Sequence, residues 1–159
     1  MTINFKVNGI PHKTNAKPES RLIDVLRNEL GLSGTKEACG EGKCGSCTIL
    51  MDGKLSLACI TPVIRAANKE IITIESLSKS GVPNFIQKAF IDADAIQCGF
   101  CTPGLIMTVK KYIDKGGTND REEIKKVISG NLCRCTGYTK IIDAVELAFK
   151  YKDEDKTTT

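Results

Sequence analysis

The sequence contains no tryptophan and a single histidine, His12, among its 159 residues. One histidine is too few for a catalytic histidine pair or for a metal centre built from several imidazoles. The sequence contains no P-loop, and its one Gly-x-Gly-x-x-Gly spacing, over residues 40–45, is interleaved with cysteines and does not follow a predicted strand, so no dinucleotide- or phosphate-binding motif is expected on this chain. Aromatic residues amount to only 5%, and no cluster of lysine and arginine alternates with them. The pattern of a nucleic-acid-binding protein is therefore missing.

Long apolar runs are missing as well, because no segment reaches the roughly 20 apolar residues that a transmembrane helix needs. The first residues, Met1–Val7, contain no apolar stretch of the kind found in signal peptides. The net charge of +4 and the 26% of charged residues describe an ordinary soluble surface. Eight cysteines without a secretory signal indicate a reducing compartment. We therefore expect a cytoplasmic protein with no membrane partner.

The eight cysteines fall into two sets of four. The first cysteine set consists of Cys39, Cys44, Cys47 and Cys59. Its C-x4-C-x2-C…C spacing is that of a plant-type [2Fe–2S] cluster, which needs soft, anionic thiolate ligands. Gly40, Gly42 and Gly45 would let this loop curl closely around a cluster, because glycine adopts positive φ and has no Cβ. The spacing and the glycines together favour iron–sulfur over structural zinc.

The second cysteine set consists of Cys98, Cys101, Cys133 and Cys135. Its Cys-x2-Cys pair could also bind zinc, so the spacing alone leaves zinc open. The Cys-x-Cys pair is uncommon in zinc ribbons, which favours a second iron–sulfur cluster. Each pair precedes a predicted helix, and the partial positive charge of a helix N-terminus favours thiolates. A disulfide framework is the weaker alternative, because the even number of cysteines occurs without a secretory signal.

Hydrophobic periodicity predicts a mixed α/β unit over residues 1–76. Apolar and polar residues alternate over residues 3–7, which predicts a half-buried strand. Asn8–Gly9 and Asp52–Gly53 predict hairpin turns. A helix capped by Ser20 is expected between the two hairpins. This half therefore reads as a small sheet curled over one helix, with the first cysteine set in a loop.

The second half of the chain has a helical pattern. Residues 77–84 contain serine, glycine and proline and are predicted to be a linker. Apolar residues over 85–150 recur at helical spacing, which predicts a bundle of four short helices. Thr102 and Pro103 are predicted to be the N-cap and the first helical residue of one of them. Residues 151–159 are charged and rich in threonine, so we expect a disordered tail.

Three segments carry a resemblance to a known family: CGEGKCGSC at 39–47, QCGFCTPG at 97–104 and GNLCRCTGY at 130–138. They are similar to the small iron–sulfur subunit of the molybdenum hydroxylases, the family of xanthine dehydrogenase, aldehyde oxidoreductase and carbon monoxide dehydrogenase. The resemblance extends over nearly the whole chain, and the second and third segments are highly specific. The resemblance favours an iron–sulfur cluster over zinc as the metal centre of the second cysteine set.

The resemblance implies an α+β chain: a plant-type ferredoxin-like β-grasp domain over 1–76, then an all-α four-helix-bundle [2Fe–2S] domain over 85–150. It implies two [2Fe–2S] clusters, molybdopterin held mainly by a large partner subunit, and FAD held by a medium partner subunit. A dimer of such heterotrimers is compatible with it. Electrons would pass from the molybdopterin centre to the second cysteine set, then to the first, then to FAD. Gln97 and Cys135 would also contact the pterin.

The function that follows is the electron-transfer subunit of a molybdenum hydroxylase, with no catalytic residue and no substrate chemistry on this chain. Its complex would oxidise a small substrate; an aldehyde is favoured, and carbon monoxide and N-heterocycles stay open. A free-standing soluble ferredoxin is the main alternative, although a lone ferredoxin needs no second domain. A zinc-stabilised interaction module is a third hypothesis, which zinc without acid-labile sulfide would support.

Overall fold

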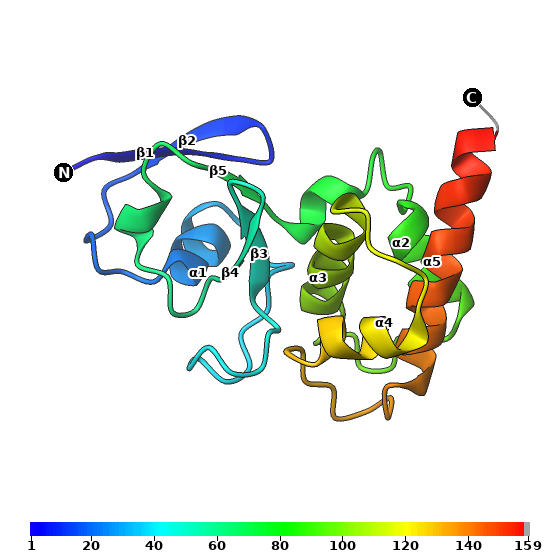
Figure 1. Ribbon diagram of the computed structural model, residues 1–159. Coiled ribbons are helices and arrows are strands. Elements are labelled where there is room, and N and C mark those ends of the chain that lie inside the picture. The colour runs from blue at the N-terminus through cyan, green and yellow to red at the C-terminus, as the bar shows by residue number, and fades with distance from the viewer. Residues whose placement is uncertain (158–159) are drawn as a thin grey trace.

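The computed structural model describes residues 1–157 and consists of two lobes that lie side by side (Figure 1). The sheet lobe contains the five strands and helix α1, and the helical lobe contains helices α2 to α5. Helix bounds in the helical lobe are α2 Phe85–Asp92, α3 Thr102–Asp114, α4 Arg121–Ile128 and α5 Thr139–Thr157. Within the described residues, no helix combines the length and apolarity needed to cross a bilayer. The arrangement is α+β, as predicted.

The sheet has the strand order β2-β1-β5-β3-β4, in which β1 and β5 run parallel and the other neighbours antiparallel. Its strands are β1 Ile3–Val7, β2 Ile10–Thr14, β3 Thr48–Met51, β4 Lys54–Leu57 and β5 Glu70–Ile72. The alternation predicted for residues 3–7 is confirmed, because buried and exposed residues alternate along β1. Both predicted hairpins are also present, each with positive φ at its two turn residues, Asn8–Gly9 and Asp52–Gly53.

The helix of the sheet lobe is less regular than predicted. It begins as α1, Leu22–Asp24, and continues as a π-helical turn over Val25–Glu29, where the Leu30 amide donates to the Val25 carbonyl. Ser20 does not cap it, because the Ser20 carbonyl is held by the Val63 amide and Arg21 occupies the N-cap position. The apolar side of this helix is nevertheless buried against the sheet.

Helix α3 also begins one residue earlier than predicted. Cys101 occupies the N-cap position, Thr102 is the first helical residue, and Pro103 follows in the first turn. Because no side chain caps this end, the Cys101 backbone alone leads into the helix. A cysteine of the second set is thereby fixed at the helix N-terminus, where a partial positive charge favours a thiolate.

The prediction of a disordered tail from residue 151 was wrong for residues 151–157, which continue helix α5. Two contacts hold the first of these residues against the bundle. The Tyr151 hydroxyl donates to Asp92 Oδ2 at 2.6 Å, and Lys152 Nζ donates to the Ile113 carbonyl at 3.4 Å. Residues 158–159 of the predicted tail lie outside the described residues.

The two lobes share strand β3. All four residues of β3 are buried, whereas a strand with one solvent face would alternate. Ile49 and Met51 belong to the apolar core of the sheet lobe, and Leu50 between them belongs to the core of the helical lobe, beside α3. The two lobes therefore pack directly on each other. The division of the chain at residues 77–84 stays a prediction.

Candidate metal centres

The first cysteine set lies on the loop that leads into β3, with its fourth member just after β4. Cys44, Cys47 and Cys59 are buried, and Cys39 is half-buried at the rim. The amides of Glu41 and Lys43 both donate to Cys39 Sγ at 3.4 Å. The three loop glycines all have positive φ, between 66° and 73°. The loop is therefore curled with its amides turned toward sulfur, as the glycines predicted.

The thiols of this set differ in acidity, and each difference has a physical cause. Backbone amides of Glu41, Lys43 and Cys44 donate to Cys39 and lower its pKa to about 6. Burial raises the pKa of Cys47 to about 12. A thiolate is thus favoured at the rim of the loop even without metal, whereas the buried thiol needs a bound cation before it ionises.

The second cysteine set is brought together from two helix starts. Cys101 lies at the N-terminus of α3, and Cys133 and Cys135 lie on the loop before α5. All four members line one cavity of about 440 Å³, together with Cys44 of the first set. Cys98 and Cys135 are exposed, and their Sγ atoms are 3.5 Å apart. Burial raises the pKa of Cys101 to about 12.

Within each set, the thiols lie close enough to act on one another's pKa: Cys44 on that of Cys39, Cys59 on that of Cys47, Cys133 on that of Cys101 and Cys98 on that of Cys135. A [2Fe–2S] core contains two irons and takes four protein thiolates, two on each iron, whereas a structural zinc ion needs four ligands around one point. Each set supplies the four thiols that one such core takes, and the four of the second set line a single cavity.

A buried junction connects the two sets across the lobe boundary. The Leu132 amide, next to Cys133, donates to the Cys44 carbonyl at 2.8 Å. Asn131 Nδ2 donates to the Gly45 carbonyl at 3.0 Å, and the Thr108 hydroxyl donates to Asn131 Oδ1 at 2.9 Å. Asn131 is only 3% exposed. The roles of Asn131 and Thr108 were missed by sequence reasoning, because their partners are far away along the chain.

Replacing Asn131 tests this junction. We expect Asn131→Leu to lower the free energy of unfolding by about 2–3 kcal/mol, because it deletes the buried hydrogen bonds to Gly45 and Thr108. Thr108→Val removes one of these bonds, so the double variant should be more stable than the sum of the two effects by about 1 kcal/mol. Denaturant unfolding of all three variants measures this, and strictly additive effects would contradict the proposed contact.

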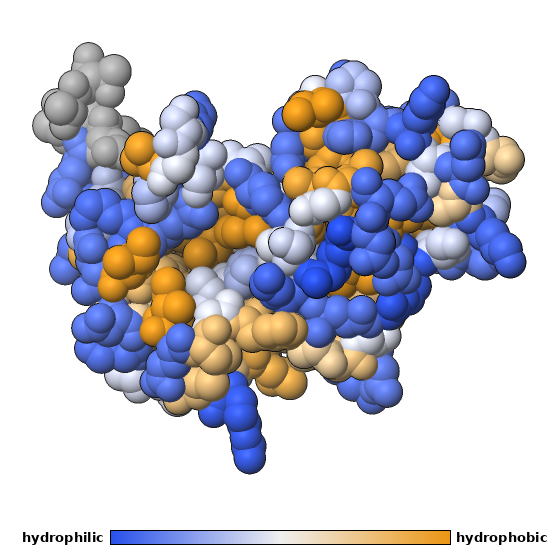
Figure 2. All heavy atoms as spheres, turned by 180° about the vertical axis from the view of Figure 1, so that it is seen from behind, coloured by the Kyte–Doolittle hydropathy of each residue, from blue (hydrophilic) through white to orange (hydrophobic). Residues whose placement is uncertain are grey.

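The predicted pterin contacts, Gln97 and Cys135, are both exposed. They lie at the same edge of the second cysteine set, since Gln97 directly precedes Cys98 and the Cys98 and Cys135 sulfurs are neighbours. Large apolar side chains are also exposed here: Ile96 is 39%, Phe100 44% and Leu132 55% accessible. The rear face of the molecule likewise shows apolar patches among hydrophilic side chains (Figure 2).

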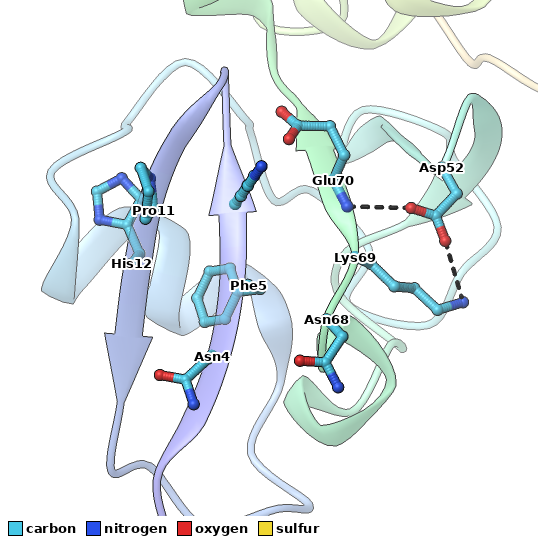
Figure 3. Close-up of a pocket in the computed structure, with 9 residues that line it drawn as sticks. Asn4, Phe5, Pro11, His12, Asp52, Asn68, Lys69 and Glu70 are labelled. Atoms are coloured by element: carbon cyan, nitrogen blue, oxygen red, sulfur yellow. Dashed lines mark hydrogen bonds and ion pairs between the residues drawn. The ribbon is translucent and has the colours of Figure 1, made fainter.

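A separate pocket of about 470 Å³ lies over strands β1, β2 and β5, away from the cysteines (Figure 3). In this pocket the Asp52 carboxylate lies 3.7 Å from Lys69 Nζ and accepts a hydrogen bond from the Glu70 backbone amide at 3.0 Å. His12 lines this pocket next to Phe5, on the strand pair formed by β1 and β2. No cysteine lines it, so it is not the metal site.

Comparison with known proteins identifies two cluster-binding regions. A family described as "2Fe-2S iron-sulfur cluster binding domain" matches residues 12–87, and one described as "[2Fe-2S] binding domain" matches residues 73–146. The nicotinate dehydrogenase small FeS subunit of Eubacterium barkeri is 44% identical over 93% of this chain and 94% of its own length. Each of the two cysteine sets lies within one of these regions.

Two solved structures share the fold closely. Quinoline 2-oxidoreductase from Pseudomonas putida 86 superimposes with a TM-score of 0.90 and 41% identity over 96% of both chains. Aldehyde oxidoreductase from Desulfovibrio gigas superimposes with a TM-score of 0.91 and 37% identity over 98% of this chain, which corresponds to 17% of that chain. The same two-lobed arrangement therefore occurs both as a separate chain and as part of a longer one.

Proposed function

This chain belongs to the iron–sulfur small subunits of the molybdenum hydroxylase family, and from that premise we propose that each of its cysteine sets holds one [2Fe–2S] cluster. The chain acts in electron transfer within an oxidoreductase. The proposed ligands of the first cluster are Cys39, Cys44, Cys47 and Cys59. Those of the second are Cys98, Cys101, Cys133 and Cys135. The convergence of the four thiols of the second set on one cavity is the observation that carries this assignment, and the amides turned toward Cys39 Sγ support it for the first set.

Each cluster supplies one-electron redox chemistry, and the chain supplies position, insulation and hydrogen bonds. The first set is enclosed by apolar residues of the sheet lobe, which keeps water away from three of its sulfurs. The second set is open to solvent at Cys98 and Cys135. A partner can therefore approach the second set directly, whereas the half-buried Cys39 is the most accessible sulfur of the first set.

The hydrogen bond between the Leu132 amide and the Cys44 carbonyl supports transfer between the two sets. Cys44 belongs to the first set, and Leu132 is covalently joined to Cys133 of the second. A few covalent bonds and one hydrogen bond of 2.8 Å thus connect a ligand residue of each set. This supports two centres that work in series, which suits the single-electron steps between a two-electron donor and a two-electron acceptor.

We assign the partners by the exposure of each set. The exposed edge with Gln97, Cys135 and the apolar side chains of Phe100 and Leu132 is proposed to face a large molybdopterin-binding subunit. The rim of the first set is proposed to face a medium FAD-binding subunit. The compartment proposed is the cytoplasm, because eight reduced thiols are needed for cluster assembly.

The substrate is proposed from the relatives, since no catalytic residue is expected on this chain. The relatives named for nicotinate and quinoline support an N-heterocycle, and the one named for an aldehyde matches with lower identity. The predicted preference for an aldehyde stays a prediction. Activity of the copurified complex on nicotinate, quinoline and a small aldehyde distinguishes these substrate classes.

Metal and sulfide analysis of the native protein tests the cluster assignment. We expect about four irons and about four acid-labile sulfides per chain, with two distinguishable paramagnetic signals after reduction. Zinc without sulfide would contradict the assignment and support the zinc-module alternative. Size-exclusion chromatography of the same sample tests the partners: coelution with molybdenum and flavin is expected, and a monomer without either would support the free-standing ferredoxin.

A further inference from the structure

Thr136 lies against a sulfur of the second cysteine set. Its hydroxyl donates to Cys133 Sγ at 3.1 Å, and its backbone amide donates to the same sulfur at 3.5 Å. Both residues are half-buried, whereas Cys98 and Cys135 of the same set are exposed. The Cys133 sulfur therefore accepts hydrogen bonds from the protein, and because it is half-buried, water competes with these donors only in part.

The orientation of the Thr136 hydroxyl is fixed by the next residues. The Tyr138 amide donates to Thr136 Oγ1 at 3.3 Å, which occupies an acceptor site on that oxygen and leaves its proton directed at sulfur. The chain turns back here so that the Tyr138 amide faces Thr136. This turn contains two successive residues with positive φ, Gly137 at 65° and Tyr138 at 71°. Positive φ is unfavourable for a tyrosine, by an amount on the order of 1–3 kcal/mol, so the turn persists only where surrounding contacts impose it.

Those contacts come from the Tyr138 hydroxyl. It accepts a hydrogen bond from the Cys133 amide at 2.9 Å and donates one to the Asn131 carbonyl at 3.3 Å. The Cys133 amide is thus committed to Tyr138. The donors that reach the Cys133 sulfur come from Thr136, and Tyr138 holds the loop that presents them.

We propose that Thr136 is a positioning residue that raises the reduction potential of the second cluster, a step that rests on the cluster assignment proposed above. Reduction adds one electron and increases the negative charge on the cluster and its sulfurs. A fixed donor at sulfur stabilises this reduced form more than the oxidised form, and hydrogen bonds to sulfur are among the factors that set cluster potentials. The chain thereby adjusts how readily its second cluster takes an electron from the partner.

Potentiometric titration of the intact complex, followed by paramagnetic resonance, tests this inference. Thr136→Val removes the hydroxyl and keeps the branched shape, and we expect the midpoint potential of the second-cluster signal to fall. Thr136→Ser retains a hydroxyl and should restore the wild-type value. The first-cluster signal should keep its potential in both variants and serves as an internal reference.

Tyr138→Phe is the control for general loosening of the loop. It removes the hydroxyl that holds the loop but no donor to sulfur, so its potential should shift in the same direction as that of Thr136→Val and by no more. A larger shift in Tyr138→Phe than in Thr136→Val, an unchanged potential in Thr136→Val, or loss of the second cluster from Thr136→Val would each overturn the inference. A wild-type protein without [2Fe–2S] signals would instead overturn the cluster assignment itself, before any potentials are compared.

Discussion

Cys101→Ser is expected to reduce the iron content of the chain to about half and to remove one of the two paramagnetic signals. Cys101 is held at the N-terminus of α3 and lines the same cavity as Cys133, so it cannot be replaced by a neighbouring thiol without moving a helix. All eight cysteines belong to the two sets, which leaves no spare one on the chain. A serine oxygen is a harder and poorer ligand for this iron chemistry than a thiolate.

Transfer of electrons from substrate to flavin should stop with the loss of this cluster, whereas the signal of the first set should remain. Cys47→Ser should give the reverse result, with the first signal lost and the second retained. Phe100→Ala, at an exposed position next to Cys101, is the matched control and should keep the full iron content. Loss of both signals from Cys101→Ser would contradict two independently held clusters.

The loss of a cluster should also destabilise the lobe that holds it. Metal binding contributes to folding because the site does not exist in the unfolded chain. The segment 98–101 lies between α2 and α3 and the segment 133–135 between α4 and α5, and the cysteines of both segments meet at the second set. We therefore expect thermal unfolding of the Cys101→Ser protein to begin at a lower temperature than that of Phe100→Ala, as circular dichroism of the complexes can measure.

The sequence predicted those features that depend on local pattern. The alternation along β1, the Asn8–Gly9 hairpin and the positive φ of the loop glycines follow from steric rules that act within a few residues. The grouping of the first cysteine set was also derived from spacing, and its assignment as a ligand set stays a prediction. Local rules failed where distant parts of the chain decide the outcome. Ser20 was predicted to cap a helix, but its carbonyl accepts a hydrogen bond from the Val63 amide instead of from an amide in the first turn of that helix.

The junction between the two sets could not be predicted in the same way. Asn131 reads as an ordinary loop residue until β3 and α3 are packed together, and its partner Gly45 is 86 positions away. Thr136 likewise shows its role only through the turn at Tyr138, because nothing in the sequence indicates positive φ at a tyrosine. Interactions that cross the lobe boundary therefore need the three-dimensional structure.

Gly104→Ala tests whether local helix propensity or packing against a distant loop decides the stability at this position. Gly104 lies in the first turn of α3, and helix propensity alone would make alanine more stable than glycine by about 1 kcal/mol. A Cβ at this position would lie 2.2 Å from the Gly45 carbonyl oxygen and 3.0 Å from Ser46 Cα. Both are backbone atoms on the loop of the first cysteine set, so no side-chain rotation can relieve the overlap. We expect a net destabilisation of about 2 kcal/mol, because an overpacking cost of about 3 kcal/mol against backbone outweighs the propensity gain.

The same substitution should disturb the link between the sets. A shift of α3 away from Gly45 lengthens the contacts made by Asn131 and by the Leu132 amide with the neighbouring loop. Electron transfer from the second cluster to the first should then be slower, which rapid-freeze experiments measure as a delayed appearance of the reduced first-cluster signal. Both clusters should remain present. Gly130→Ala is the matched control: it lies at the same junction, but its Cβ would meet no atom within 4 Å. A Gly104→Ala protein as stable as Gly130→Ala would show that the two loops do not approach as closely as the structure indicates, and the direct connection between the cysteine sets would have to be abandoned.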